Sequence, residues 1–197
     1  MRDELEISRS SVAIDYFDPL QRHLDHSDHV AAVLTEACNY VGTNVIVEGG
    51  VTLIGGKFAC GVGIRLGDNV RIYSGSHLVV DQVDERSGIE LGPGVSLNYN
   101  CYIEGSGGVT IGPGTIIGPN VVILSSRHNV VADQPITRSG KTFQPVSIGG
   151  DVWIGANVVV MPGLVIGDCA VLGAGAIVTR SVPERSVVAG NPARPLS

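Results

Sequence analysis

The carboxy-terminal part of the chain repeats itself every six residues. Between residues 148 and 183, glycine directly follows most of the recurring aliphatic positions, and a small residue stands four places after them. The aliphatic register is Ile148, Ile154, Val160, Ile166, Leu172 and Val178. A six-residue period is neither the 2.0 of a flat strand nor the 3.6 of a helix. It is typical of a parallel β-helix, in which each hexapeptide forms one face of a coil.

The same register continues toward the amino terminus with two interruptions. After a start near Val45, it is predicted to run through Ile54, Cys60, Leu66, Ile72 and Leu78. Residues 79–88 break the register, and it resumes at Leu91. Three hexapeptides make one triangular coil, so the chain predicts roughly six to seven coils. The second interruption, residues 125–147, contains His128, and long loops inside a regular solenoid are usually functional.

The residues before the repeat predict a helical cap. Asp18-Pro19 has the form of a helix start, Ser27-Asp28 of a second, and Gly42 of a helix end. We therefore expect a helical cap over 1–44, a β-helix catalytic domain over 45–185, and a tail over 186–197. His23, His26 and His29 recur every three residues. They suggest a metal cluster, although the helix break near Ser27 favours a solvated helix entrance.

Composition narrows the function classes. Hydrophobic residues make up 44% and charged residues 16%, which suits a solenoid with a continuous apolar core. A net charge of −6 argues against non-specific nucleic-acid binding. No apolar stretch has membrane-spanning length, and the first ten residues lack the apolar core of a signal peptide. We expect a cytoplasmic protein with no nucleic-acid partner and no membrane span.

Several motifs together resemble a known family. They are LNYNC at 97–101, SSRH at 125–128, QPVSIGGDVWIGANVVVMPGLVIG at 144–167, GAGAIVTRSVP at 173–183 and AGNPAR at 189–194. The pattern is similar to bacterial hexapeptide-repeat O-acetyltransferases, of the galactoside, maltose and glycan-modifying types, over about residues 90–195. This resemblance implies an all-β, left-handed parallel β-helix. It also implies a homotrimer that binds acetyl-CoA between neighbouring solenoids and has a role in polysaccharide modification.

The resemblance also implies roles for individual residues. His128 stands at the general-base position, Asn98 at a position that contacts the acceptor, and Ala156 where a backbone N–H serves the oxyanion. The positions that bind coenzyme A would be Trp153, Ala156, Ala174, Thr179, Arg180 and Arg194, the two arginines near its phosphates. No metal is required. Trp153 can contact the coenzyme or a subunit interface, or can equally cap a hydrophobic face. Asn98 can instead be a turn residue, and Arg180 and Arg194 can instead be solvated surface charges.

The implied chemistry is coherent on physical grounds. A sugar hydroxyl is a weak nucleophile, and histidine, which titrates near neutrality, is the commonest base for activating it. A fixed N–H stabilises the oxygen of an attacked thioester, and arginines suit the phosphates of the donor. No serine or cysteine pairs convincingly with His128, which favours direct attack in a ternary complex.

Alternatives remain open at this point. The family's Asn-aromatic-Asn element is commonly followed by Asp, whereas the nearest acid here is Glu104, so the acceptor can be a sugar, an antibiotic or serine. A zinc-dependent carbonic anhydrase needs three histidine ligands, and His77 and His128 supply two. A non-catalytic solenoid that binds partners through its flat faces is the third possibility.

Overall fold

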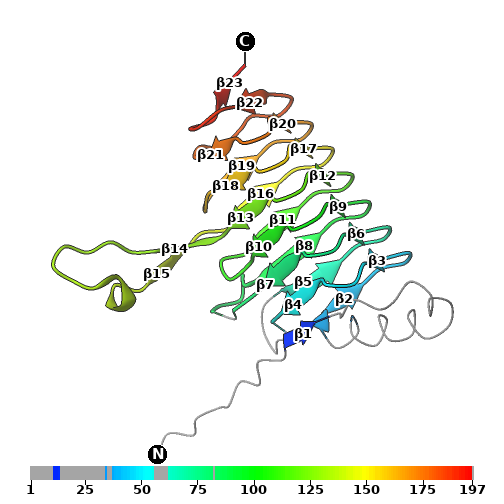
Figure 1. Cartoon of the computed structure of the whole chain (residues 1–197), viewed down its shortest axis with the longest axis horizontal. Coiled ribbons are helices and arrows are strands. Elements are labelled where there is room, and N and C mark those ends of the chain that lie inside the picture. The colour runs from blue at the N-terminus through cyan, green and yellow to red at the C-terminus, as the bar shows by residue number, and fades with distance from the viewer. Residues whose placement is uncertain (1–10, 14–33, 35–36, 56–61, 82, 197) are drawn as a thin grey trace, which may run out of the picture.

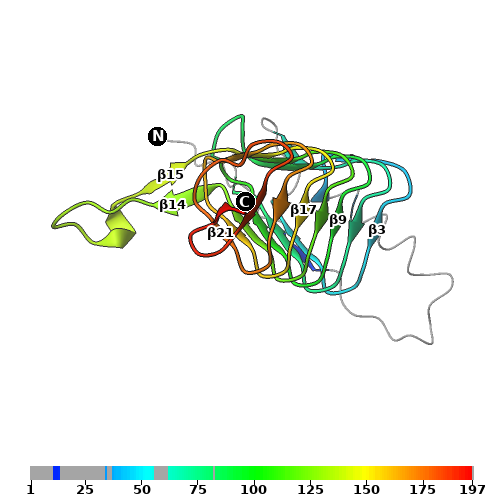
Figure 2. The same cartoon turned by 90° about the horizontal axis from the view of Figure 1, so that it is seen from above.

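The computed structural model describes residues 11–13, 34, 37–55, 62–81 and 83–196. The chain winds into stacked triangular coils, from which one long hairpin projects sideways (Figures 1 and 2). Each coil contributes one short strand to each of three sheets. Residues of the same sheet therefore lie in vertical rows along the solenoid.

The strands of each sheet are hydrogen-bonded in the following spatial orders. Sheet A contains β1 (Ser11–Ala13), β4 (Thr52–Ile54), β7 (His77–Val79), β10 (Tyr102–Glu104), β13 (Val122–Leu124), β18 (Val159–Val160) and β21 (Ile177–Val178). Sheet B contains β19 (Val165–Ile166), β16 (Val146–Ile148), β11 (Val109–Ile111), β8 (Gly88–Leu91), β5 (Gly63–Leu66) and β2 (Tyr40–Val41). Sheet C contains β23 (Arg194–Pro195), β22 (Val187–Ala189), β20 (Val171–Leu172), β17 (Trp153–Ile154), β12 (Ile116–Ile117), β9 (Ser96–Leu97), β6 (Arg71–Ile72) and β3 (Ile46–Val47).

The chain passes through the sheets in the order B, C, A, and thus turns at three edges of the prism. We call these the B–C edge, the C–A edge and the A–B edge. The coil strands pair in parallel, and only β1 against β4 and β23 against β22 pair antiparallel within these sheets. The strands β22 and β23 lie within the predicted tail, residues 186–197, and add two strands to the carboxy-terminal end of sheet C.

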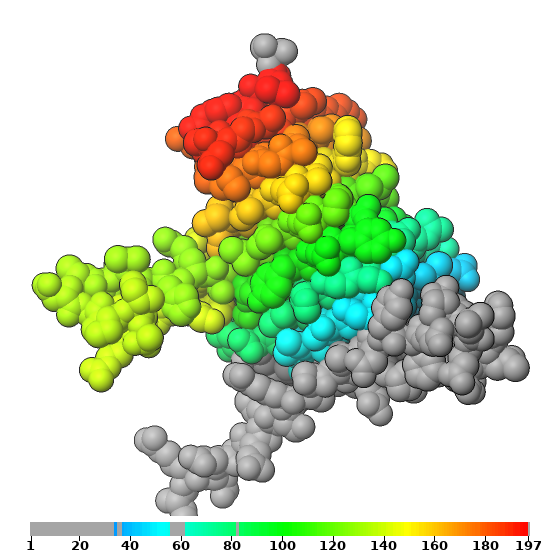
Figure 3. Space-filling model, in the orientation of Figure 1, coloured from blue at the N-terminus to red at the C-terminus, as the bar shows by residue number. Residues whose placement is uncertain are grey.

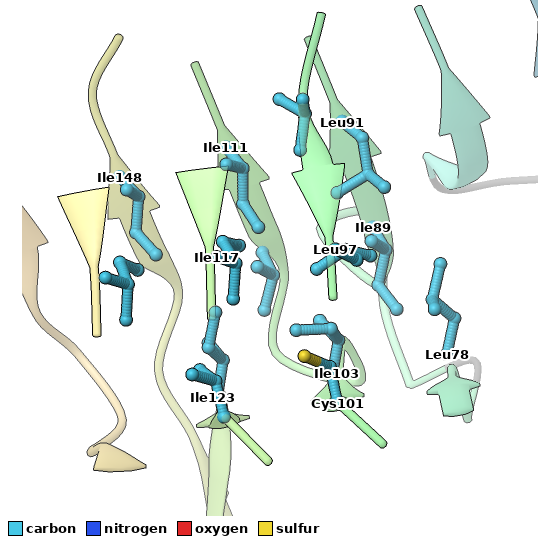
Figure 4. Packing of buried hydrophobic residues seen from close by; sticks show 14 of the residues in the cluster. Leu78, Ile89, Leu91, Leu97, Cys101, Ile103, Ile111, Ile117, Ile123 and Ile148 are labelled. Carbon is cyan, nitrogen blue, oxygen red and sulfur yellow. The ribbon is translucent and has the colours of Figure 1, made fainter. Parts of the chain in front are cut away.

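The hexapeptide register fills the interior. Leu97, Ile103, Ile117 and Ile123 are fully buried and stack with Ile89, Leu91, Ile111 and Ile148 of sheet B (Figure 4). Each such side chain contributes roughly 1.5–3 kcal/mol on burial. The pairing of Leu97 with Ile117 and of Ile103 with Ile123 shows the stacking directly. The predicted inward register is confirmed over these coils.

The register prediction was wrong by one residue at Ile54, whereas Leu66, Ile72 and Leu78 are buried as predicted. Leu53, rather than Ile54, pairs with Leu78 and is fully buried, whereas Ile54 is partly exposed. The reason is that the connection from β4 to β5 is one residue longer than a whole number of hexapeptides. Cys60, assigned to the same register, lies outside the described residues.

Within the predicted helical cap, the structure describes residues 11–13, 34 and 37–44. Residues 11–13 form a strand, β1, rather than part of a helix, because they pair antiparallel with β4. Leu34 and Ala37 have helical backbone and are buried with Cys38 in the core. The first coil strand is β2, slightly before the expected start near Val45. The predicted helix starts at residues 18–19 and 27–28, and His23, His26 and His29, lie outside the described residues.

The second interruption forms a hairpin, which we call the arm and define as residues 125–144. It contains β14 (Ser126–His128), the 3₁₀ helix η1 (Ile136–Arg138) and β15 (Lys141–Phe143), with the two strands antiparallel. The arm leaves the prism at the A–B edge, after β13, and stands well clear of its surface (Figure 3). The coil resumes at β16 from Val146.

Candidate functional site

His128 lies on the arm. It ends β14, is exposed, and faces Lys141 across the hairpin. The next residue, Asn129, ties the two sides of the arm together. Its Nδ2 donates to the carbonyl of Ser139 at 3.1 Å, and its Oδ1 accepts from Thr142 Oγ1 at 2.5 Å. The hairpin thus fixes the backbone of His128 while the ring remains accessible.

Glu104 holds the root of the arm. One carboxylate oxygen accepts from the Ser125 N–H at 3.1 Å and from Ser125 Oγ at 3.2 Å, and the other accepts from the Ser106 N–H at 2.9 Å. Partial burial acts to raise the pKa of Glu104. Hydrogen bonds from Ser106, Ser126 and Ser125 outweigh that effect and hold the pKa below its usual value.

Asn98 lies in the C–A edge turn that follows β9. Its Oδ1 accepts from the Tyr99 N–H at 2.9 Å, whereas its Nδ2 donates no hydrogen bond to another described residue. The left-handed backbone position of this turn is Asn100, with φ 58°. Asn100 therefore fills the conformational role that asparagine serves in turns. The amide nitrogen of Asn98 remains available to a ligand.

Ala156 and Ala174 stand in the same column of turns. Strand pairing places Tyr99, Pro119, Ala156 and Ala174 one above another toward the carboxy-terminal end. Within the part of the chain that the structure covers, the N–H groups of Ala156 and Ala174 have no acceptor. Two N–H groups at the B–C edge are instead capped by aspartates, that of Thr43 by Asp68 at 2.6 Å and that of Gly150 by Asp168 at 2.8 Å.

Glycines keep this column tight. A Cβ at Gly118 would lie 2.8 Å from the amide nitrogen of Ala156, and a Cβ at Gly155 would lie 2.6 Å from that of Ala174. Side chains at these positions would therefore collide with the next coil. The result is a strip of small residues with unpaired N–H groups, which is able to stabilise negative charge on a ligand oxygen.

The remaining predicted residues lie near the carboxy-terminal end. Thr179 and Arg180 are exposed at the A–B edge, directly after β21. Arg194 lies in β23 near the C–A edge, because its neighbour Ala193 donates to the carbonyl of Ile177 at 2.8 Å. Trp153 is 59% exposed on the outer face of sheet C, between Ile116 and Val171.

The structure therefore sorts the predicted site residues into two groups. One group lies along the A–B edge and on its arm: His128, Thr179 and Arg180. The other lies at or beside the C–A edge: Asn98, Trp153, Ala156, Ala174 and Arg194. The strands of sheet A separate these edges, so one chain does not bring the two groups together.

Two residues near the predicted site residues, Glu104 and Tyr73, are not predicted from the sequence to take part in the site. The sequence does not predict that Glu104 holds the root of the arm, although an acid at the end of a hexapeptide, directly before Gly105, indicates a side chain placed at an edge of the coil. Tyr73 was not singled out; one coil below Asn98, its ring lies 5.2 Å from that of Tyr99. Among the described residues, no group of three or more His, Cys, Asp or Glu side chains is placed to hold a metal ion.

Two family models match the chain. "Bacterial transferase hexapeptide (six repeats)" matches residues 145–180, and "Hexapeptide repeat of succinyl-transferase" matches residues 52–79. No helix among the described residues is long and apolar enough to cross a membrane.

The curated relatives match about half of the chain. The galactoside O-acetyltransferase of Escherichia coli (strain K12) is 40% identical over 109 residues, which are 55% of this chain and 53% of that protein. Nodulation protein L of Rhizobium meliloti (strain 1021) is 45% identical over 108 residues, 54% of this chain and 57% of that protein. The chain thus spans about half the length of the curated relatives it matches.

Solved structures match more of the chain. A galactoside acetyltransferase in complex with coenzyme A is 29% identical, with a TM-score of 0.56, over 89% of this chain and 72% of that one. AntD, an N-acyltransferase from Bacillus cereus, is 18% identical with a TM-score of 0.71, over 87% of both chains, and shows the fold. The left-handed parallel β-helix and the resemblance to hexapeptide-repeat O-acetyltransferases, both predicted from the sequence, are confirmed.

Proposed function

We propose that this protein transfers the acetyl group of acetyl-CoA to a hydroxyl of a sugar or glycan. The site would form between the A–B edge of one subunit and the C–A edge of the next. The observation that carries the proposal is the division of the site residues between these two edges. The likeness to galactoside O-acetyltransferases, and to a galactoside acetyltransferase bound to coenzyme A, supports the reaction and the donor.

A ring of three copies satisfies this division. When each A–B edge faces the C–A edge of the next subunit, three identical sites close the ring. Sheet A then faces the three-fold axis, because both of its edges contact neighbours. The outward row Val122, Val159 and Ile177 of sheet A is aliphatic and half-buried, which suits close approach of other copies.

The reaction follows from the groups at the two edges. His128 accepts the proton of the acceptor hydroxyl while that oxygen attacks the thioester carbonyl. The N–H of Ala156 donates to the oxygen that becomes negative. The C–S bond then breaks, and His128 returns its proton to the departing thiolate. The Nδ2 of Asn98 donates to an oxygen of the acceptor and orients it.

The donor would lie along the strip of small residues. Ala174 continues the strip beyond Ala156, and Thr179, Arg180 and Arg194 flank its carboxy-terminal end from the two facing edges. The arginines supply cations for the phosphates of acetyl-CoA. The exposed indole of Trp153 offers an apolar contact beside the strip or to the neighbouring subunit.

The test is to replace the base. We expect His128→Ala to lower kcat by roughly 10²–10⁴ while the KM for acetyl-CoA stays the same, because the histidine acts on the acceptor. Lys141→Ala, opposite His128 in the hairpin, controls for disturbance of the arm and should retain activity. Free-thiol release from acetyl-CoA with a panel of sugars, serine and aminoglycosides measures turnover. Near-normal turnover by His128→Ala would remove the histidine from the mechanism, and activity confined to serine or aminoglycosides would overturn the sugar acceptor.

A further inference from the structure

Building on the proposed function, we propose that Tyr99, supported by Tyr73 and flanked by Asn98, is a stacking platform for a pyranose ring of the acceptor. The platform lies in the C–A edge column, next to the strip assigned to the donor. It gives the acceptor a class: a neutral sugar rather than a small alcohol or a phosphorylated sugar.

The side chains in the C–A edge column change from small to bulky at Asn98 and Tyr99. Its turns are Gly173-Ala174, Gly155-Ala156 and Gly118-Pro119 toward the carboxy-terminal end, all small and close-packed. One coil below Gly118-Pro119 stand Asn98 and Tyr99, and Tyr73 lies beneath Asn98. The bulky side chains therefore begin where the small ones end. A ligand whose reacting atom lies at Ala156 would have its narrow donor on one side and its acceptor against the aromatic rings.

The two rings support each other in an exposed position. Their centroids are 5.2 Å apart with planes inclined at 45°, a normal arrangement for an aromatic pair. Tyr73 is half-buried, whereas Tyr99 is 47% exposed. The backbone beneath them is fixed, since Tyr73 N–H donates to the Leu97 carbonyl at 3.0 Å and Asn120 N–H donates to the Tyr99 carbonyl at 2.9 Å. Tyr99 is thus a rigid ring presented to solvent.

The polar groups around the rings suit a neutral sugar. The Nδ2 of Asn98 donates no hydrogen bond within the described chain and is available to a hydroxyl. Glu48 accepts from Ser74 Oγ at 2.8 Å and Ser74 N–H at 3.2 Å, and places a carboxylate on the lower side. The three turns at 48–50, 73–75 and 98–100 contain no lysine or arginine. A tyrosine ring offers an apolar face for the C–H face of a sugar. The Glu48 carboxylate below Tyr73 disfavours a phosphate at the rings, and the exposed cation Arg71 lies beside the column on the outer face of sheet C.

The test compares acceptors and donor in one set of variants. We expect Tyr99→Ala to raise the KM for a neutral methyl glycoside about tenfold, equivalent to roughly 1.4 kcal/mol. The KM for acetyl-CoA should not change. Tyr99→Phe should restore most of the affinity, because the ring face is retained. Tyr40→Ala, which removes an exposed tyrosine from sheet B, is the matched control and should leave both KM values unchanged.

A binding measurement separates this inference from the proposed function. Saturation-transfer NMR of the same methyl glycoside should show aromatic contact in the wild type and lose it in Tyr99→Ala, with or without turnover. Glycoside binding that depends on Tyr99, but no acetyl transfer, would overturn the reaction and leave the platform standing. Acetyl transfer to glycosides that is indifferent to Tyr99→Ala would overturn the platform and leave the reaction standing.

Discussion

At the scale of the residue, the choice between alanine and proline decides whether a turn offers a hydrogen-bond donor. Pro119 and Ala156 occupy equivalent places in consecutive C–A edge turns, each followed by an asparagine with φ near 58°. Proline is favoured at this place in such a turn, and it carries no N–H. Ala156 keeps the donor that Pro119 lacks. The backbone conformation of the turn therefore does not depend on whether this position carries an N–H donor.

This equivalence yields a clean substitution. We expect Ala156→Pro to fold with nearly unchanged thermal stability, because the turn already accepts proline one coil below. It should lower kcat by roughly 10²–10³, the usual loss for one oxyanion donor. Ala156→Gly, which keeps the N–H, is the control. Thermal unfolding and steady-state kinetics measure both effects, and a fully active proline variant would show that this N–H takes no part.

At the scale of the element, the arm depends on charge at its root. The two carboxylate oxygens of Glu104 accept three hydrogen bonds from Ser106 and Ser125, and the arm begins at Ser125. Because the pKa of Glu104 is lowered in the folded chain, the stability that its ionised carboxylate gives to the folded state is fully present above the ordinary pKa of 4.5. That contribution is lost as the pH falls through the lowered pKa.

We therefore expect Glu104→Gln to loosen the arm at neutral pH as acid loosens it in the wild type. Amide hydrogen exchange at Ser106 and Ser125 should accelerate about tenfold, while the sheet amides stay protected. Glu90→Gln, which removes a carboxylate from the outer face of sheet B, should leave the arm unchanged. Equal exchange in Glu104→Gln and wild type would show that the backbone alone holds the root.

The elements show how far sequence reasoning reaches. The hexapeptide register predicted the coils because a buried aliphatic side chain must recur once per face, as Leu97, Ile103 and Ile117 do. The register prediction failed at Ile54, because the loop that follows β4 contains one additional residue. A shift of one residue along a strand exchanges the side chains that point inward with those that point outward. The interruption was predicted, but not its hairpin, since Ser126–His128 and Lys141–Phe143 carry no period of their own.

At the scale of the whole molecule, the site residues lie on two edges that one chain keeps apart. The motifs predict roles for His128, Asn98 and Ala156, and these roles remain predictions. Their separation was not recognised, because it depends on which of the three edges each turn occupies. That assignment requires every loop length to be known.

Mixed trimers test the division between edges. The His128→Ala and Asn98→Ala variants should each be impaired alone. In a coexpressed one-to-one mixture, an intact site forms wherever the A–B edge of an Asn98→Ala subunit meets the C–A edge of a His128→Ala subunit. Random assembly should therefore give about a quarter of the sites of the wild type. The double variant mixed with wild type controls for subunit exchange. No recovery, with mixed trimers demonstrated by mass spectrometry, would place both residues in a site within one chain.

The arm has a consequence for how such a chain can change. Its two ends meet at the prism, where Gln144 N–H donates to the Ser125 carbonyl at 2.8 Å, and β16 then pairs with β11 as though nothing had been inserted. The length and composition of the segment between them, residues 126–143, can therefore vary without shifting the coils before and after it. Replacement of residues 126–143 would change how far the arm extends from an unaltered β-helix, and thus which part of the proposed neighbouring subunit it could contact.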